Sequence, residues 1–406
     1  MLSRSILFAA LLAAIPARAD GHSFFDAVKA GTPYLTFNTR YEGVDQDNGL
    51  EDASALTLLT RFGFKTAEVN GVSALVEFED SRILFDVDDF SVPPTGFNSG
   101  EFSVIADPET TELDQAYIQY VGEGLKARIG RQIIIYDSQR FVGAVPWRQD
   151  WQTYDAVHFE YTGVEKLTLK AGHIFARNRI FAEQRDLNSN DTLFDATYDT
   201  PYGKLGAYAY LLEVDDIGRN GLDTLGARFK GSYAIPDASP SGINKVHYKL
   251  ELATQDVETA TGDFTTRYLA AEAGVGIKAV TIKAGIERLG SDGGSVGFAT
   301  PLATLHKFNG WADLFLATPA AGLEDVYASV AGKADKFKWV FIYHDYSSDV
   351  RTASGSDLGS ELNFQLTRPI GERTTFGFKW AQYDPGDPGF GLVETNRIWS
   401  WLTVKF

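Results

Sequence analysis

The chain lacks cysteine entirely among its 406 residues. It therefore forms no disulfide bond, offers no thiolate ligand to a metal ion and has no thiol for catalysis. It also lacks any run of about 20 uninterrupted apolar residues, which is the length that a membrane-spanning helix needs. Positive charge is scarce, because 37 Lys and Arg stand against 54 Asp and Glu and give a formal net charge of −17. This balance argues against nucleic acid as a partner.

The N-terminus has the layout of a cleaved export signal. Arg4 precedes an apolar run at residues 6–15, and Ala17-Arg18-Ala19 forms an A-x-A site that signal peptidase would cut before Asp20. We therefore expect residues 1–19 to be a signal peptide. Residues 20–406 are expected to form a single exported domain, because no linker or low-complexity tract divides them.

The C-terminus predicts where the exported chain resides. Residues 396–406 alternate in polarity and stop on Phe406. A terminal aromatic is typical of the closing strand of a bacterial outer-membrane β-barrel, where the ring lies at the lipid interface. We expect the barrel-insertion machinery to recognise this strand through Phe406, and the outer membrane's lipid and lipopolysaccharide to surround the protein.

Segments of period two recur from Tyr34 to the end of the chain, separated alternately by tight turns and by longer Gly/Asp/Pro-rich stretches. In bacterial barrels the short turns are periplasmic and the long loops extracellular. The pattern predicts an all-β fold, a transmembrane antiparallel β-barrel of about 18 strands. The predicted strands are residues 33–42, 54–65, 72–83, 112–121, 125–135, 153–162, 166–176, 191–200, 204–214, 222–233, 245–255, 265–277, 279–290, 324–332, 337–346, 358–368, 372–383 and 395–406.

The long outer loops are expected at residues 43–53, 84–111, 136–152, 177–190, 291–323 and 384–394. The two longest, 84–111 and 291–323, have enough chain to fold inward and narrow the lumen. The pattern leaves open whether they close it, and it leaves open a monomer or a trimer.

Alternation within each predicted strand assigns the side chains to lipid or lumen. In residues 54–65, Leu56, Leu58 and Phe62 share the lipid side, whereas Thr57 and Arg61 share the other. The same alternation turns several further charged residues toward the lumen, of both signs: Lys126, Arg128, Lys170, Arg228, Lys230, Glu77, Glu79, Glu160, Glu251, Glu287 and Glu361. Two interpretations stay open. The charges either solvate a water-filled lumen and pair across strands, or the basic ones form a constriction that favours anions.

Two segments are unusually rich in aromatic and charged residues. Residues 129–155 hold Arg131, Arg140 and Arg148 together with Trp147 and Trp151. An aromatic face packs on sugar C–H groups and a guanidinium binds a carboxylate, so this combination suits an acidic sugar. The alternative is a loop that tryptophan anchors in the membrane interface and salt bridges hold.

The second segment, residues 305–315, lies within a long predicted loop. It combines His306, Lys307, Asn309, Trp311 and Asp313. Such a polar and aromatic stretch predicts either an inward-folded plug or gate, or an ordered loop packed on the rim.

At these segments the sequence resembles the alginate-export porin family. The family carries an early GRQ motif, an arginine-glycine-tryptophan-arginine-glutamine series that ends on aspartate, and a late HKFNG-Trp-Ala-Asp stretch. The matching residues here are Gly130-Arg131-Gln132, Arg140, Gly143, Trp147-Arg148-Gln149, Asp155 and residues 306–313, and residues 106–120 also look like the family's pattern. The resemblance covers essentially the mature chain.

This resemblance implies an 18-stranded outer-membrane channel with an arginine-rich, electropositive constriction that passes an anionic uronate polymer or oligomer. It does not carry over the direction of transport or the actual substrate. The chain differs from the family in its modest outer loops and its acidic net charge.

We therefore expect a passive porin for anionic solutes, with alginate-like uronate saccharides as the first substrate class and a general or small-anion diffusion porin as the alternative. An outer-membrane barrel enzyme is a lesser alternative, because His344 and Asp345 are neighbours on a strand and so point to opposite faces. A soluble secreted β-protein would not explain Phe406.

No catalytic residue and no cofactor is expected. No metal is expected either, since the acidic first loop with Asp45, Asp47 and Glu51 lacks a full calcium motif. The residues expected to line the anion path are Arg61, Lys126, Arg128, Arg131, Arg140, Arg148, Arg228 and Lys230, with Trp147, Trp151, Trp311, His306 and Asp313 as aromatic or loop candidates.

Overall fold

The computed structural model describes residues 24–215, 217–235 and 242–406. The predicted signal peptide, residues 1–19, lies outside the described residues. Within the described part, none of the helices has the length and apolar character that crossing a membrane requires.

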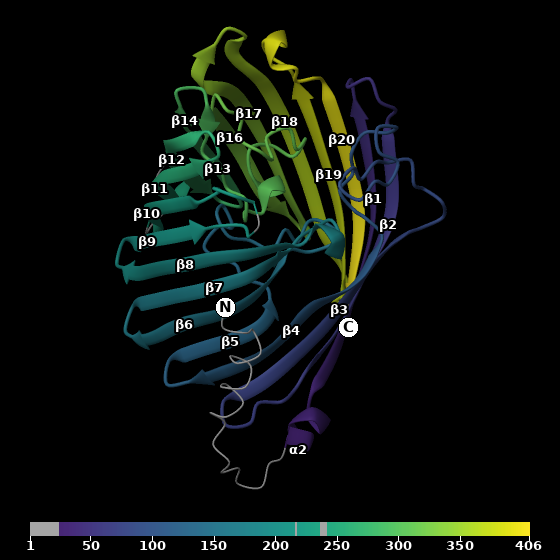
Figure 1. Ribbon diagram of the computed structural model, residues 1–406, viewed down its shortest axis with the longest axis vertical. Helices are drawn as coiled ribbons and strands as arrows, with labels where there is room; N and C mark the ends of the chain where they lie inside the picture. Colours follow the sequence, from purple (N-terminus) through teal and green to yellow (C-terminus); the bar gives the residue numbers. More distant parts are fainter. Residues whose placement is uncertain (1–23, 216, 236–241) are drawn as a thin grey trace.

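After the short helix α2 (Phe24–Lys29), the chain is built of β-strands (Figure 1). Eighteen of them form one sheet: β1 (Thr32–Gln46), β2 (Ala53–Lys65), β3 (Val72–Ile83), β4 (Thr110–Gly122), β5 (Leu125–Gln132), β6 (Thr153–Val164), β7 (Leu167–Asn178), β8 (Leu187–Thr200), β9 (Gly203–Leu212), β10 (Leu222–Ala234), β11 (Ile243–Thr259), β12 (Gly262–Ile277), β13 (Val280–Leu289), β16 (Leu323–Ala334), β17 (Phe337–Thr352), β18 (Gly355–Ile370), β19 (Thr374–Asp384) and β20 (Thr395–Lys405). The loop after β13 contains the two-residue strands β14 (Ser291–Asp292) and β15 (Val296–Gly297) and the 3-10 helix η2 (Leu305–Lys307); η1 (Glu183–Arg185) and η3 (Pro388–Phe390) lie in other loops.

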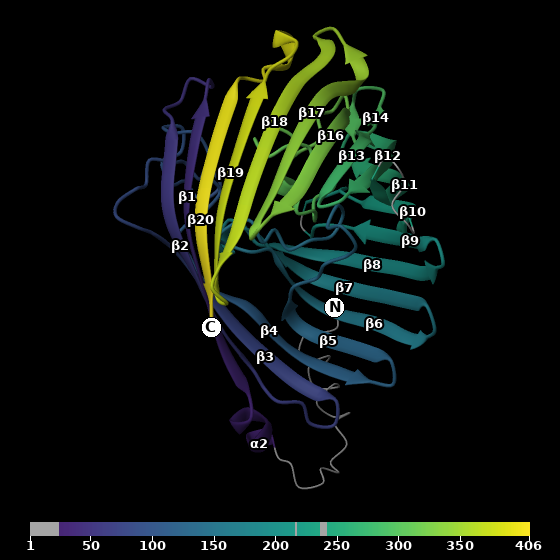
Figure 2. The same cartoon turned by 180° about the vertical axis from the view of Figure 1, so that it is seen from behind.

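The sheet closes on itself. Each strand pairs antiparallel with the next, and β1 pairs with both β2 and β20. The ladder continues to the last residue, because Phe406 donates its backbone N–H to Leu35 O at 2.8 Å and accepts from Leu35 N at 3.3 Å. Figures 1 and 2 show the strands around a ring, with coil segments crossing the space that they enclose. Closure leaves no unpaired edge among the eighteen described strands, as a spanning sheet requires.

The strand count predicted from periodicity is confirmed, and the boundary errors are instructive. β17 continues to Thr352 and β18 starts at Gly355, although the sequence there is polar. Strands that project beyond the lipid keep their hydrogen bonds without needing an apolar face. The opposite error concerns β5, which ends at Gln132 because Ile133 donates its backbone N–H to the Gln115 side chain at 3.3 Å instead of continuing the ladder.

The predicted alternation of faces is also observed. On β2 the Arg61 side chain is buried inside, whereas the next residue, Phe62, is 51% exposed on the outside. Phe78, Phe159 and Phe194 are similarly exposed. A charge placed on that outer face at mid-membrane would cost about 2–4 kcal/mol, which fixes the sheet's orientation.

Three outer loops enter the barrel. Loop 84–109 packs Phe90, Val92 and Ile105 against the inner face of β1 and β2, on Val44 and Ala55. The longest, residues 290–322, also enters, and so does the shorter loop 133–152, which the sequence did not single out for inward folding.

Loops 133–152 and 290–322, called the plug loops below, meet inside the lumen. Phe141 packs edge-on against Tyr268 of β12 and Phe298, at ring-centroid distances of 5.3 and 6.0 Å. The backbone of Gly143 donates to Leu302 O at 2.8 Å. The outer half of the barrel therefore has its own apolar core.

Candidate pore constriction

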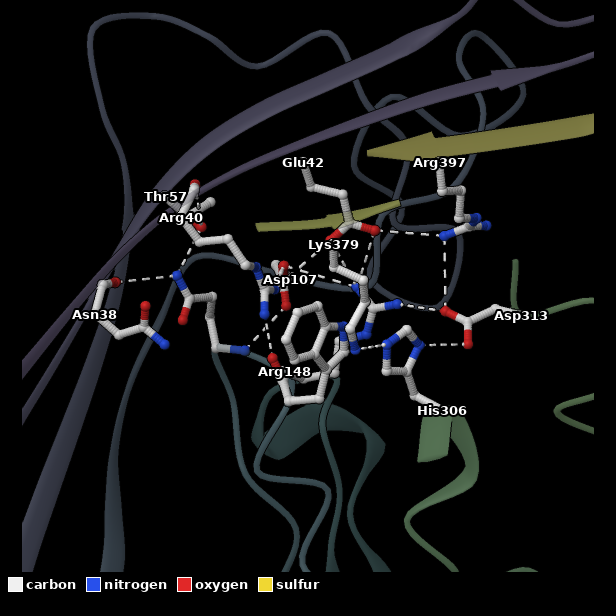
Figure 3. A network of polar contacts seen from close by, with 12 residues as sticks. Asn38, Arg40, Glu42, Thr57, Asp107, Arg148, His306, Asp313, Lys379 and Arg397 are labelled. Carbon is white, nitrogen blue, oxygen red and sulfur yellow. Dashed lines mark hydrogen bonds and ion pairs between the residues drawn. The ribbon is translucent and has the colours of Figure 1, made fainter. Parts of the chain in front are cut away.

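A buried charge network forms where the plug loops reach the inner wall of β1, β19 and β20 (Figure 3). Arg40 and Glu42 are two positions apart on β1 and so share its lumen face. Cross-strand register brings β19 to the same place, because Glu42 and Lys379 both lie opposite Trp399 of β20. The wall thus presents charges of both signs to whatever enters.

The loops complete this network with their own charges. Arg148 Nη1 lies 3.1 Å from Glu42 Oε2, and its Nη2 lies 2.8 Å from Asp313 Oδ2. Asp107 from loop 84–109 pairs with Arg40. All of these side chains are at most 5% exposed.

Arg397 of β20 contacts the same carboxylates, at 3.4 Å from Glu42 Oε1 and 3.7 Å from Asp313 Oδ2. The constriction network is defined here as Arg40, Glu42, Asp107, Arg148, His306, Asp313, Lys379 and Arg397. It combines the cations Arg40, Arg148, Arg397 and Lys379 with the carboxylates Glu42, Asp107 and Asp313, which leaves a formal excess of one positive charge.

His306 links the loop carboxylate to the wall. Burial lowers the pKa of His306 to about 3, although the Asp313 carboxylate opposes this shift. The neutral ring therefore donates from Nδ1 to Asp313 Oδ1 at 2.7 Å and accepts at Nε2 from Lys379 Nζ at 2.9 Å. Trp147 stacks on the imidazole at 4.7 Å between ring centroids, and Lys379 Nζ lies 3.6 Å from the Trp147 ring centroid.

The two loop carboxylates of the network, Asp107 and Asp313, are held in their charged forms. Burial would raise the pKa of Asp313, but the hydrogen bond from His306 and the charge of Arg148 outweigh it and hold that pKa well below its usual range. Burial would likewise raise the pKa of Asp107, but Arg40 and Arg148 outweigh it and lower the pKa.

A second set of contacts fixes the plug loops to the wall at β13 and β18. Arg140 Nε lies 2.8 Å from Glu287 Oε1 on β13, and its Nη2 donates to Asn309 Oδ1 at 3.0 Å. Asn309 in turn donates to Glu287 Oε2 at 2.7 Å. Glu361 of β18 accepts hydrogen bonds from the backbone N–H groups of Trp311 and Ala312, the latter at 2.9 Å. Arg140 therefore positions one plug loop on the other.

Arg61 lies in a third cluster on β2. Its guanidinium pairs with Glu77 and Asp114 and stacks 3.7 Å from the Trp151 ring centroid. The Trp151 backbone N–H donates to Glu79 Oε1 at 3.0 Å. This cluster has more carboxylates than cations, so Arg61 is held by internal partners.

A row of basic side chains follows the lumen face in the periplasmic half of the barrel. Lys126 and Arg128 of β5 begin the row, and Lys126 interacts electrostatically with Arg128, Glu160, Lys170 and Lys65. The row continues with Arg228, Lys230, Lys249 and Lys283 on β10, β11 and β13. We call these residues, together with Lys170, the basic row.

The basic row is only partly neutralised. Lys170 lies 3.7 Å from Glu160, Arg228 Nη2 lies 2.7 Å from Asp195, and Lys230 pairs with Asp137. Lys249 lies 3.1 Å from Glu251, and Lys283 lies 2.9 Å from Glu272. Arg128 has an amide partner instead, donating to Gln119 Oε1 at 2.8 Å. Among the ion pairs of the described residues, none includes Lys126 or Arg128.

The structure separates the residues that the sequence grouped together. Arg148, Trp147, His306, Asp313 and Trp311 meet in or beside the constriction network. The others lie elsewhere, with Arg140 between the plug loops, Arg61 beside Trp151, and Lys126, Arg128, Arg228 and Lys230 in the basic row.

Arg131 lies apart from all of these. It is three residues beyond Arg128, so it points to the other side of β5, where it pairs with Asp155 at 2.8 Å.

Several members of the network were not predicted from the sequence. Arg397 alternates with Trp399 and Trp401 in the closing strand, and this spacing would have placed all three on the lumen face. Asp107 carries no such signal, because only the fold of its loop brings it to Arg40. In the described residues, no group of three or more His, Asp or Glu side chains is arranged to hold a metal ion.

Solved structures with this architecture are outer-membrane porins. Pseudomonas aeruginosa OpdO aligns with a TM-score of 0.70 and 12% identity, over 95% of this chain and 99% of that one. P. aeruginosa OpdK, solved with vanillate, gives 0.72 and 12% over 93% and 99%. Acinetobacter baumannii OccAB1 gives 0.69 and 12% over 96% and 98%. At such identity the likeness establishes the shared fold.

Curated protein sequences offer no match to this chain. The sequence pattern of the alginate export family, however, matches residues 36–287, which is more than half of the chain. The resemblance seen in its motifs is thereby confirmed. The chain belongs to the alginate export family and is a porin-type β-barrel of the bacterial outer membrane.

Proposed function

We propose that this porin is a passive channel for anionic solutes, with uronate saccharides as its first substrate class. The observation that carries the proposal is the basic row, in which Lys126 and Arg128 face the lumen without a carboxylate partner among the described ion pairs. Rings or ladders of basic side chains in a narrow pore attract anions and repel cations.

The charge balance of the lumen supports this proposal despite the acidic chain. Formal net charge is −17, but part of the acid lies in the outer loop 43–53, where Asp45, Asp47, Glu51 and Asp52 are exposed. At physiological ionic strength the Debye length is about 8 Å, so a solute inside the barrel is sensitive mainly to the wall beside it. The relevant wall is the basic row.

Uronate is favoured by the family and by the geometry of guanidinium groups, which bind carboxylates in two-point contacts. The structure gives less support to the prediction that Trp147 and Trp151 pack on a sugar ring. His306 and Lys379 cover Trp147, and Arg61 covers Trp151, which fits the anchoring interpretation of these rings. Charge is therefore the main recognition element in this proposal.

Planar-bilayer recording tests the proposal. We expect the double variant Lys126→Gln/Arg128→Gln to lose most of the anion preference seen in the reversal potential. The matched control Arg82→Gln/Lys166→Gln removes the same charge outside the lumen, from an outward position on β3 and from a periplasmic turn, and should leave the preference unchanged. Equal selectivity in both double variants would contradict the role of the basic row.

A solute test separates uronate from small anions in general. An alginate trisaccharide should block the chloride current of the native channel, whereas neutral maltotriose should not. Anion preference without any block by the trisaccharide would instead support a small-anion diffusion porin.

A further inference from the structure

The carboxylates in the constriction network differ in where they are attached. Glu42 belongs to β1 and is fixed to the wall by the sheet. Asp313 belongs to the plug loop 290–322 and reaches Arg148 and Arg397 from that loop. A loop can leave its position without breaking the barrel, whereas a wall residue cannot.

The backbone around Asp313 is bent to make this contact. Asp313 has a φ of 63° and Asn309 a φ of 54°, both in the left-handed region that non-glycine residues adopt only at some cost. Gly310 between them has a φ of 86°. Asn, Asp and Gly enter this region more readily than other residues, and contacts with Glu361, Glu287 and Arg148 hold the segment in place.

Three buried hydrogen-bond donors in or beside the network have no acceptor among the described residues. Arg40 Nε, Arg397 Nε and Trp399 Nε1 are buried and have no partner among the described residues. Buried donors without acceptors are costly, so the site is incomplete as it stands. Additional acceptor oxygens would satisfy it.

From these observations we propose that Asp313 is a tethered competitor, an internal carboxylate that occupies the place where Arg148 and Arg397 would bind the carboxylate of a passing solute. The solute displaces Asp313, gains the two guanidinium groups and offers its further oxygens to the free donors. Asp313 thereby determines specificity, because only a solute that replaces its charge can open the contact.

This inference rests on the proposed function, since it assumes an anionic solute. It also predicts how removal of one carboxylate changes the selectivity of the channel, which the proposed function alone does not. Removing the Asp313 charge should make the channel more selective for anions and should tighten its binding of uronate, because the competitor is gone while every arginine remains.

The test compares Asp313→Asn with Asp313→Glu and with the control Asp80→Asn, which removes a carboxylate paired with Arg82 on the outward face of β3. In Asp313→Asn we expect at least about a fivefold lower half-blocking concentration of an alginate trisaccharide, together with a reversal potential shifted toward anions. Asp313→Glu and Asp80→Asn should behave like the native channel.

Two further readouts keep the test decisive. Heat-modifiable gel migration confirms that each variant folds. Uptake of neutral maltotriose into liposomes measures any loosening of the plug, because Asp313→Asn also removes the ion pair with Arg148. The anion current and the affinity for the trisaccharide should rise by more than maltotriose uptake does. A rise in maltotriose uptake equal to the rise in anion current would show a loosened plug and overturn the proposal.

The outcomes also separate this inference from the proposed function. A native channel without anion preference would refute the proposed function itself. A native channel that prefers anions and is blocked by the trisaccharide, with Asp313→Asn behaving identically, would refute only the tethered competitor.

Discussion

Replacing Arg148 with Met should release the plug loops while leaving the barrel intact. Arg148 contacts Glu42 at 3.1 Å and Asp313 at 2.8 Å, and it is 4% exposed. At an effective dielectric constant of about 20, each contact carries roughly 5 kcal/mol of gross Coulomb energy, most of which offsets the burial of the charges. Breaking a buried pair typically costs a net of about 3–5 kcal/mol, because the partner carboxylates stay buried.

This cost falls on local opening of the loops, since the barrel's hydrogen bonds do not depend on Arg148. A loss of about 3–5 kcal/mol raises the open population by roughly two to three and a half powers of ten. The amides to follow by hydrogen exchange are those that join the loops, Gly143 N to Leu302 O at 2.8 Å and Thr304 N to Gln139 O at 3.0 Å. We expect their exchange to accelerate by at least about a hundredfold.

Two controls bound the result. Arg148→Lys keeps the charge but loses the two-point geometry, so its exchange should lie between native and Arg148→Met. Arg82→Met removes the exposed pair with Asp80 and should change nothing in the loops, because such pairs contribute less than about 1 kcal/mol. Unchanged loop exchange in Arg148→Met, or equal acceleration in the barrel strands, would refute the reasoning.

Three further predictions concern pH, backbone strain and assembly. The plug should weaken in acid. Folding lowers the pKa of His306 from 6.5 to about 3, so the folded plug keeps the ring neutral while the unfolded loop takes up a proton below pH 6.5. The stability of the plug is therefore complete above pH 6.5 and decreases as the pH falls from 6.5 to about 3. The lowered pKa of Asp313 has an effect in the same direction. Hydrogen exchange of the plug-loop amides should therefore rise from pH 6.5 toward pH 3, and His306→Gln should make this pH dependence smaller. Plug-loop exchange that does not change with pH in the native protein would contradict the role given to His306. Gly310→Ala should destabilise the plug loop 290–322 by about 1–2 kcal/mol or more, because Gly310 has a φ of 86° and an added Cβ would meet Glu361. Proteolysis of the outer loops in intact membranes measures this loss, and a variant as resistant as the native protein would contradict the prediction. Phe406→Ala should slow membrane insertion without changing the final fold. The rate at which the heat-modifiable barrel appears after synthesis measures this, and an unchanged rate would show that Phe406 is not part of the assembly signal.

The sequence predicted the barrel well because lipid imposes a local rule on it. Every strand must show apolar side chains outward and polar ones inward, so Phe62 and Arg61 reveal their faces from alternation alone. Strand ends outside the lipid, such as Thr352, escape that rule, and polarity therefore misplaced them.

The site could be predicted only in part, because its contacts cross the lumen. Trp147, Arg148, His306 and Asp313 stood out through unusual composition, yet nothing in the sequence says that loop 133–152 reaches Glu287 on β13. Asp107 meets Arg40 only through the path of loop 84–109. Such pairings depend on tertiary packing, which a period of two does not encode.

The most direct test of the account is the reversal potential of the native channel across a planar bilayer with a salt gradient. If the basic row with Lys126 and Arg128 governs permeation, the zero-current voltage will have the sign expected of an anion-selective channel. An alginate trisaccharide will then reduce the current, whereas maltotriose will not. A zero-current voltage of the opposite sign would show a channel for cations and would contradict the central claim.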